Sequence, residues 1–358
     1  MRTSLPCFTG GTLLKTLFRP AVSPRVLPGN MKIAILHALI PEGADTEEQD
    51  TLVQVEAVLR ALAGLGHDAR ALPFSLDLQA AAQSLQALSP DLVFNLVEGI
   101  NGQGRLIHLS PALLDYLHIP YTGAPADAMY LTSNKLLAKR LLRDRGIPTP
   151  HWLADSALEE QDAFNGSAFI IKAVWEHASV GLDEDSIITP IDRKHLNREI
   201  AQRQHTWNRE FFAERYIDGR EFNLSLLASD RGPEVLPPAE IKFVDYPSGK
   251  KRVVGYRAKW DEASFEYQHT QRCFSFPEED RPLLDKISAL AEKCWQVFGL
   301  RGYARVDFRV DGTGAPFVLE VNANPCIAPD SGFVAAAARA GIDFIGLVER
   351  ILKDTMRT

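Results

Sequence analysis

Apolar and polar residues alternate with a period of two in two runs near the C-terminal end of the chain. The runs span residues 305–309 (Arg-Val-Asp-Phe-Arg) and 317–322 (Phe-Val-Leu-Glu-Val-Asn). This period is typical of a β-strand. The sequence Asp-Gly-Thr-Gly at 311–314 has the composition of a tight turn, so we expect the two runs to form an antiparallel hairpin.

Polar side chains gather on one face of this expected hairpin. Residues two apart on a strand share a face, so Arg305 lies beside Asp307 and Glu320 beside Asn322. Hard oxygen ligands on rigid strands suit Mg²⁺, which takes its remaining ligands from water and phosphates. A solvated outer face with mixed charges is the alternative, since antiparallel sheets often have one. The Asn-Pro step at 324–325 favours a site, and hence nucleotide-phosphate chemistry.

The first third of the chain alternates short apolar runs with segments of helical periodicity. This order predicts a parallel, doubly wound sheet, the arrangement of an α/β protein. The expected strands are 33–37, 69–72 and 91–96, and the expected helices are 49–65 and 78–88. Ligands of such sheets bind beyond the carboxyl ends of the strands, where the glycine-rich loop 98–104 lies. A simple strand-to-helix turn explains this loop about as well.

The remaining chain predicts a second and a third unit, with α+β character towards the C-terminus. In the second, Asn134 caps a helix at 135–145, and a buried strand at 169–172 precedes another near 187–188. The third contains expected strands at 212–216, 221–227 and 235–243, a helix at 279–298, the hairpin and two terminal helices.

At 358 residues the chain is long enough for two or three domains. We place them at 31–123, 124–212 and 213–358. Residues 1–30 carry basic but no acidic side chains and lead into a strand-like run. We interpret them as a disordered extension, or as the result of a start codon placed upstream of Met31.

Charge and cysteine usage exclude several classes of protein. A net charge of −7 argues against a general nucleic-acid binder. No apolar stretch reaches the length needed to cross a bilayer. The four cysteines are scattered without a C-x-x-C pair, which suits reduced thiols in the cytoplasm. We therefore expect small-molecule partners, with no nucleic acid and no membrane.

The strand expected at 169–172 ends in Lys172. An ammonium group at the inner end of an apolar strand requires a compensating anion, and phosphate would provide one. A lysine that reaches solvent along its own apolar stem explains the pattern equally well.

Together these motifs resemble the ATP-grasp superfamily, and within it the D-alanine–D-alanine ligase family. The likeness runs from Met31 to the end of the chain and is specific in the C-terminal two thirds. Besides the hairpin, it rests on the segments Ser133–Arg140, Phe212–Phe222 and Arg257–Trp260. It implies a Rossmann-like N-terminal domain followed by two sheets that clamp ATP.

The resemblance also implies how the nucleotide is held. The implied contacts are Lys135 and Lys172 at the phosphates, Glu214 at the adenine amino group, Ile217 at the base through its backbone, Glu221 at the ribose and Lys259 at the γ-phosphate. A phosphate-covering loop follows the second lysine. There Ser179 keeps the second of the family's paired serines, and Ala178 replaces the first.

For the hairpin, the resemblance implies a site for two Mg²⁺ ions, with Mn²⁺ as an alternative. Asp307, Glu320 and Asn322 would be the metal ligands. Arg305 would stabilise the transition state, and with Lys259 and Ser179 it completes the expected catalytic set.

The substrate side departs from the family pattern. Residues 41–48 lack the family's Gly-Gly-x-Ser-x-Glu sequence; Glu47 falls at a matching distance from the next helix, but a helix-start acid explains it equally well. Glu98 stands where a histidine is common, and Cys326 where a glycine is usual. Ser331 keeps the position of a serine that binds the substrate carboxylate. Because Cys326 has no histidine partner in the sequence, we interpret it as a packing residue.

We therefore expect an ATP-dependent carboxylate–amine ligase that forms an amide or peptide bond through an acyl phosphate and releases ADP. D-Alanine as both substrates is less favoured than a different acid or amine, because the substrate loops differ. A non-catalytic ATP-binding regulatory module is the main alternative. A carboxylase is disfavoured because the chain has no Met-Lys-Met-type biotin acceptor. Members of the family are often dimers, so the resemblance leaves a homodimer open.

Overall fold

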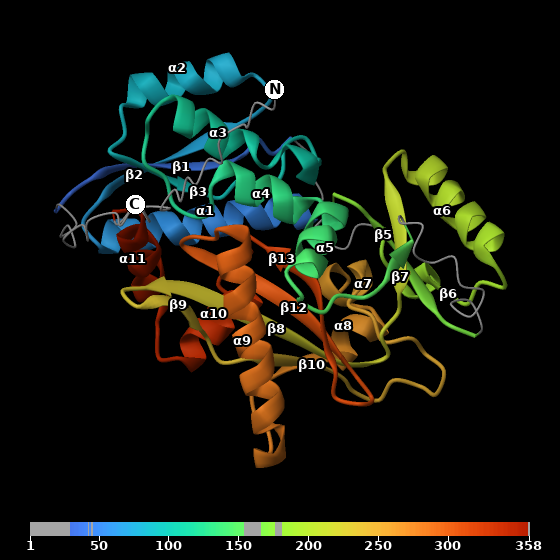
Figure 1. The fold of residues 1–358 in the computed structure, drawn as a ribbon. Helices are drawn as coiled ribbons and strands as arrows, with labels where there is room; N and C mark the ends of the chain where they lie inside the picture. The colour runs from blue at the N-terminus through green and yellow to red at the C-terminus, as the bar shows by residue number, and fades with distance from the viewer. Residues whose placement is uncertain (1–28, 42, 44–45, 154–165, 176–180, 357–358) are drawn as a thin grey trace, which may run out of the picture.

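The computed structural model describes residues 29–356 except 42, 44–45, 154–165 and 176–180, and of residues 46–48 it describes only the backbone. Within these ranges the chain forms three sheets, which Figure 1 shows as separate layers with helices packed around them. None of the helices in the described ranges is both long and apolar enough to cross a lipid bilayer.

The first sheet is parallel, as the alternating pattern of the sequence predicts. Its strands are β1 (Lys32–Ala38), β2 (Asp68–Phe74) and β3 (Leu92–Asn95), in the order β2-β1-β3. Helix α1 (Thr46–Gly64) covers one face, and α2 (Leu78–Leu88) and α3 (Leu109–Tyr116) cover the other (Figure 1). Strands β1 and β3 are buried because helices cover both faces, whereas the edge strand β2 is largely exposed.

The second sheet is small and antiparallel. It has the order β4-β7-β5-β6 and carries one helix on its outer side. The elements are β4 (Trp152–Leu153), β5 (Phe169–Ala173), β6 (Ile187–Ile188), β7 (Phe211–Arg215) and α6 (Arg193–Trp207). Two helices, α4 (Ala126–Ser133) and α5 (Lys135–Asp144), precede it. Asn134 starts the second of these helices, because its side-chain oxygen accepts the backbone N–H groups of Leu136 and Leu137, each at 3.0 Å.

The third sheet is antiparallel and contains the hairpin. The strands β11-β10-β8-β12-β13 lie in that order, and β9 pairs with β8. Their bounds are β8 (Gly219–Ser229), β9 (Gly232–Val235), β10 (Ala239–Phe243), β11 (Thr270–Cys273), β12 (Tyr303–Asp311) and β13 (Pro316–Asn322). The associated helices are α7 (Tyr256–Trp260), α8 (Phe265–His269), α9 (Arg281–Phe298), α10 (Gly332–Arg339) and α11 (Phe344–Thr355).

One predicted strand is wrong. The run 235–243 does not form a single strand but is divided between the end of β9 and β10. The break falls at Pro237 and Pro238, which have no backbone N–H to donate to a neighbouring strand. Apolar residues alternate with polar ones on both sides of the two prolines, so the pattern alone predicted one continuous strand.

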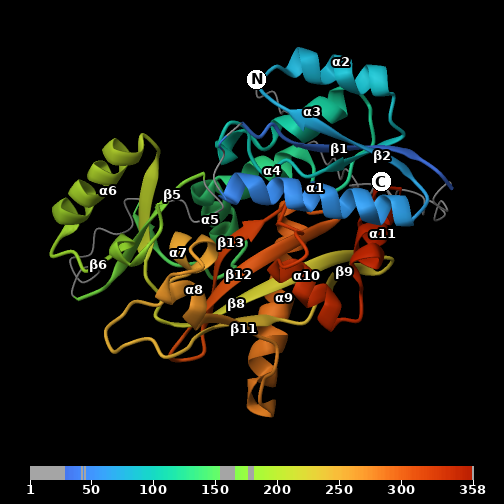
Figure 2. The same cartoon turned by 180° about the vertical axis from the view of Figure 1, so that it is seen from behind.

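The larger apolar cores join the first and third sheets, and smaller clusters join the second sheet to Leu136 of α5 and to Val253. Side chains from β1 and α1 share a core with those of α10 and α11, and Figure 2 shows α1 lying between the first and third sheets. Helices α4, α5 and α9 pack on β8, β12 and β13 in a second core. The second sheet has its own small core with α6.

A close backbone approach lies at the start of β8. Gly219 has a φ of +155°, and a Cβ atom added there would lie 2.0 Å from the carbonyl oxygen of Val310 on β12. A side chain at this position would therefore push the two strands apart. Glycine here keeps the strand that carries Glu221 tightly paired with the hairpin strand.

Candidate active site

A cavity of about 810 Å³ lies where the three sheets meet. Its wall contains every predicted site side chain that the structure describes: Lys135, Lys172, Glu214, Ile217, Glu221, Lys259, Arg305, Asp307, Glu320, Asn322 and Ser331. Ser179 and the side chain of Glu47 lie outside the described residues. Segments that are far apart in the sequence thus meet around one space.

The hairpin presents the predicted polar face to this cavity. Asp307 pairs across the strands with Glu320, and Arg305 pairs with Asn322. The guanidinium of Arg305 donates to both oxygens of Asp307, at 2.8 and 2.9 Å. Asn223 on the adjacent strand β8 donates to Asp307 Oδ1 at 2.8 Å. The register therefore gathers the acidic and amide groups on one face.

The donor set of the hairpin fits a hard cation, although its acids are engaged in ion pairs. Glu320 lies 3.4 Å from the Lys135 ammonium and 3.9 Å from the Arg305 guanidinium. Burial alone would lower the pKa of Arg305, but the carboxylates of Asp307 and Glu320 raise it. Within the described ranges, no three acidic, histidine or cysteine side chains converge on a metal position. A cation here would thus need ligands from a phosphate as well.

The predicted adenine-binding carboxylate is held between two lysines. Glu214 Oε1 accepts from the Lys172 ammonium at 2.6 Å, and Glu214 Oε2 lies 2.5 Å from the Lys139 ammonium. Burial would raise the pKa of Glu214, but the two cations lower it below the ordinary value. Lys139 also donates to Thr149 Oγ1 at 2.7 Å. This carboxylate is therefore an ionised acceptor at the cavity wall.

Lys139 and Arg309 are site residues that the sequence reasoning missed. Lys139 lies one helical turn after Lys135, so its spacing placed it on the same face of α5. Arg309 lies two positions after Asp307 on β12 and pairs with Glu221 at 2.7 Å. Their partners, Glu214 and Glu221, are remote from them in the sequence, so no local sequence pattern indicated these ion pairs.

Lys259 lies on α7, in the long connection between β10 and β11. Burial lowers the pKa of its ammonium, Arg305 lowers it further, and the carboxylates of Glu320 and Asp307 oppose this. The charged side chains of the hairpin therefore act electrostatically on the Lys259 ammonium. Its half-buried position suits contact with an anionic ligand.

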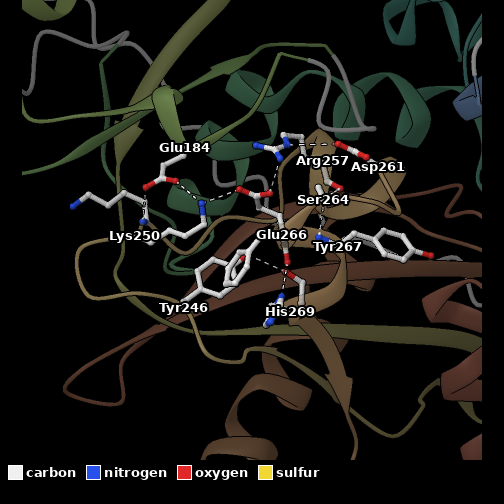
Figure 3. Close-up of polar contacts among 12 residues, drawn as sticks. Glu184, Tyr246, Lys250, Arg257, Asp261, Ser264, Glu266, Tyr267 and His269 are labelled. Carbon is white, nitrogen blue, oxygen red and sulfur yellow. Dashed lines mark hydrogen bonds and ion pairs between the residues drawn. The ribbon is translucent and has the colours of Figure 1, made fainter.

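A polar network fastens this connection to the second unit. Figure 3 shows Lys250 between Glu184 and Glu266, with its ammonium 2.8 Å from a carboxylate oxygen of each. Glu184 belongs to the 3₁₀ helix η4 (Glu184–Ser186), which precedes β6, and Glu266 belongs to α8. Arg257 on α7 adds a contact to Glu266 at 3.3 Å. The network thus holds the helix that carries Lys259 over the cavity.

The far end of the cavity contains the residues that depart from the family pattern. Ser331 caps α10, and its Oγ accepts the Val334 N–H at 3.3 Å. Cys326 is more than a packing residue, because its thiol donates to Asp50 Oδ2 at 3.1 Å. Burial raises the pKa of Cys326 well above the ordinary value, so it is no thiolate nucleophile. Glu98 also lines this end.

The chain is similar to known proteins along most of its length. Residues 141–353 match the family model of the D-ala D-ala ligase C-terminus. The D-alanine–D-alanine ligase of Moorella thermoacetica is 31% identical over 339 residues, covering 90% of this chain and 98% of that protein. The D-alanine–D-alanine ligase of Chromohalobacter salexigens is 33% identical over 316 residues, covering 87% of this chain and 92% of that protein.

Solved structures share the fold. The D-alanine–D-alanine ligase of Bacillus anthracis complexed with ATP superimposes with a TM-score of 0.67 at 22% identity, over 91% of this chain and 98% of that chain. D-alanyl-alanine synthetase A of Vibrio cholerae gives a TM-score of 0.68 at 18% identity, over 92% of this chain and 100% of that chain. The expected α/β architecture with an ATP-grasp arrangement of sheets is confirmed.

Proposed function

This chain belongs to the D-alanine–D-alanine ligase family and is an ATP-dependent ligase that forms C–N bonds, and from this premise we propose how its cavity joins an acid to an amine. The observation that carries the proposal is the convergence of lysines, acids and Arg305 from three sheets on one cavity. A purely regulatory ATP-binding module would not need the acids and arginine of the hairpin. Membership of a family of ligases also favours an enzyme over such a module.

The proposed reaction has two steps. An oxygen of the substrate carboxylate attacks the γ-phosphorus of ATP, the bond to the β-phosphate oxygen breaks, and ADP leaves. The amine nitrogen then attacks the acyl carbon of the resulting acyl phosphate, loses a proton, and displaces inorganic phosphate. Arg305 would stabilise the oxyanion of this second step, and its position in the lining of the cavity supports this role.

The protein contributes alignment and charge neutralisation. We assign the phosphates to Lys135, Lys172 and Lys259, which all line the cavity. Glu214 would accept the adenine amino group, and Ile217 would contact the base through its backbone. Glu221, oriented by Arg309 at 2.7 Å, would bind the ribose hydroxyl groups. We assign Ser179 to the loop that covers the phosphates.

Asp307, Glu320 and Asn322 would hold Mg²⁺, for which Mn²⁺ is an alternative. When bound, two such ions would neutralise the phosphate oxygens and lower the barrier to phosphoryl transfer. The role of the chain's own residues is to fix these ligands. Asn223 and the cross-strand register hold Asp307 opposite Glu320.

The two substrates that we propose are not both the D-alanine that the names of the relatives indicate. Ser331 would bind a substrate carboxylate, and Glu47 is the acid that the sequence pattern offers for an amino group. Because Glu98 and Cys326 replace the usual histidine and glycine, we propose an acid or amine other than D-alanine in at least one of the two positions. We further propose a cytoplasmic enzyme and a homodimer.

A turnover assay with Mg²⁺–ATP and pooled L- and D-amino acids tests the function. Product masses and released phosphate are recorded together. A condensation product with one phosphate per bond is expected, and its mass identifies the substrates. Phosphate release without any condensed product would point to a missing amine. ATP binding without phosphate release or product in any pool would contradict the ligase.

A further inference from the structure

The first unit contacts the second sheet at the half-buried side chain of Trp175. This tryptophan follows the end of β5, three positions after Lys172. The Arg105 guanidinium, in the 3₁₀ helix η1 (Gly104–Leu106), lies 5.3 Å from the centroid of the Trp175 ring. This distance is within the range of a cation–π interaction. A residue of the first unit therefore packs on the strand end that carries a proposed phosphate lysine.

Two further contacts fix the orientation of the Trp175 ring. Its Nε1–H donates to Glu210 Oε2 at 2.7 Å. The Tyr130 ring, on α4, lies 5.5 Å from the Trp175 ring between centroids, at an interplanar angle of 53°. His108 packs edge-on against Tyr130, with 5.0 Å between their centroids. Side chains from the first unit, from α4 and from the residue before β7 thus hold one indole.

The backbone beside Trp175 joins the two proposed phosphate lysines. The carbonyl oxygen of Val174 accepts the backbone N–H of Lys135 at 3.0 Å, and the Val174 N–H donates to the carbonyl oxygen of Glu210 at 2.9 Å. Lys135 is the first residue of α5, and Lys172 lies on β5, two positions before Val174. A shift of residues 174–175 therefore changes the separation of the two ammonium groups.

A second contact joins the same two units. Arg209, which precedes Glu210, donates to the carbonyl oxygen of Gly102 at 3.3 Å. Gly102 belongs to the glycine-rich loop 98–104, for which the sequence offered a simple strand-to-helix turn. The structure thus shows this loop and Arg105 after it in contact with the second sheet. Neither Arg105 nor Trp175 is among the described residues that line the cavity.

Resting on the proposed assignment of Lys135 and Lys172 to the phosphates of ATP, we propose that Trp175 is a positioning residue for these two lysines. Arg105 and Glu210 hold its ring from two different units. The ring in turn fixes residues 174–175, to which the backbone of Lys135 is hydrogen-bonded. Arg105 acts on the nucleotide through Trp175 and is not itself a ligand.

Calorimetric titration with two ligands separates a positioning role from a general loss of structure. One ligand is the β,γ-imido analogue of ATP with Mg²⁺, which has three phosphate groups and is not hydrolysed. The other is adenosine, which has none. Adenosine depends on the contacts to the base and ribose, whereas the analogue also needs both lysines. A positioning role therefore predicts weaker binding of the analogue at an unchanged affinity for adenosine.

Replacement of the indole should have a graded effect on the analogue. Trp175→Leu removes the ring and should weaken its binding about tenfold, because the contacts to Arg105 and Glu210 are both lost. The affinity for adenosine should stay within about twofold of wild type, since the base and ribose contacts remain. Trp175→Phe keeps a ring for Arg105 and should bring the affinity for the analogue back to within about threefold of wild type.

A double-mutant cycle tests whether Arg105 acts through Trp175. Arg105→Met keeps an apolar stem but removes the guanidinium, and it should weaken binding of the analogue about threefold. When Arg105→Met is combined with Trp175→Leu, the loss should equal that of Trp175→Leu alone, because the cation–π contact is already absent.

Two control variants remove similar groups from exposed positions of the first unit. Tyr116→Leu removes a ring at the end of α3 that is 78% exposed. Arg60→Met removes a guanidinium from an α1 side chain that is 70% exposed. Both variants should bind the two ligands as wild type does.

The outcomes that contradict the proposal differ from one another. Equal affinity of wild type and Trp175→Leu for the analogue overturns the positioning role and leaves the ligase standing. A parallel loss of analogue and adenosine binding also overturns it, because the whole site is then disturbed. Additive losses in the double variant overturn the link through Arg105. If wild type does not bind the analogue, the proposed nucleotide site is wrong, and the positioning role is wrong with it.

Discussion

The Lys139 ammonium lies 2.5 Å from Glu214 Oε2, and each side chain retains only 1% of its accessible surface. The pair links α5 to β7, so the helix that supplies Lys135 and the strand that supplies Glu214 are fixed to each other. The Lys172 ammonium at Oε1 completes the arrangement. If Glu214 binds the adenine base as we propose, its orientation depends on a lysine whose ammonium is buried behind the carboxylate.

Replacement of Lys139 by methionine should destabilise the protein and weaken ATP binding. Loss of one partner leaves a buried carboxylate with less compensation, which typically costs about 3–5 kcal/mol. Urea unfolding and calorimetric ATP titration measure the two effects. Arg140→Met is the control, since Arg140 is the exposed neighbour on the same helix. Equal stability and equal ATP affinity in the two variants would show that the pair does not orient Glu214.

Replacement of Glu320 by alanine should abolish turnover and leave ATP binding detectable. In the proposed site the lysines and Glu214 still hold the nucleotide, but the hairpin loses a proposed ligand of the cation that assists phosphoryl transfer, so the rate should fall by on the order of 10³. Steady-state turnover and nucleotide titration are compared. Glu279→Ala removes an exposed acid of the 3₁₀ helix η5 (Glu278–Asp280) as the control. Normal turnover of the Glu320 variant would refute the metal assignment.

Replacement of Lys250 by methionine should raise KM for ATP by about tenfold with a small change in overall stability. Its ammonium holds Glu184 and Glu266 together, each at 2.8 Å, and so keeps the α7–α8 connection over the cavity. Kinetics and the rate of limited proteolysis within residues 245–270 report on this. Lys251→Met removes a neighbouring exposed ammonium. The anchoring role is wrong if both variants bind ATP alike and resist protease equally.

The ionisation of Glu98 should make the free energy of unfolding depend on pH. Burial raises its pKa from 4.5 to about 7. Between these values the folded state binds the extra proton, so ionisation of Glu98 lowers the free energy of unfolding as pH rises from about 4.5 to 7. Glu98→Gln removes this loss. Without substrates, the stability of the variant relative to wild type should increase by on the order of 2 kcal/mol between pH 4.5 and pH 8.

Urea unfolding of both proteins at the two pH values measures this change. Glu56→Gln, at an exposed position, should follow wild type throughout. A constant difference between Glu98→Gln and wild type across this range would show that Glu98 titrates normally. The prediction is independent of turnover.

Local patterns of the sequence were enough to predict the hairpin. The exact register was not predictable in this way: an unbroken pairing from the turn would bring Asp307 opposite Leu319, and a shift of one residue between Asp307 and Phe308 brings it opposite Glu320 instead. The family motif placed Lys135, Glu214 and Glu221 at one cavity because it records their spacing. Contacts between remote segments carry no local pattern: Cys326 meets Asp50 across 276 positions of the chain. Such a contact forms only in the folded protein, where α1 packs on the segment that follows the hairpin.

The separate core of the second sheet has a mechanical consequence. The first and third sheets share side chains through α1, α10 and α11, whereas the second sheet has a core of its own with α6. Because α5 packs on the third sheet, rotation of the second sheet about the connections at 145–151 and 216–218 would have to break the buried Lys139–Glu214 pair. We expect ATP to enter and ADP to leave by this rotation. Where it is slow, the hinge sets the turnover rate rather than the bond-forming step.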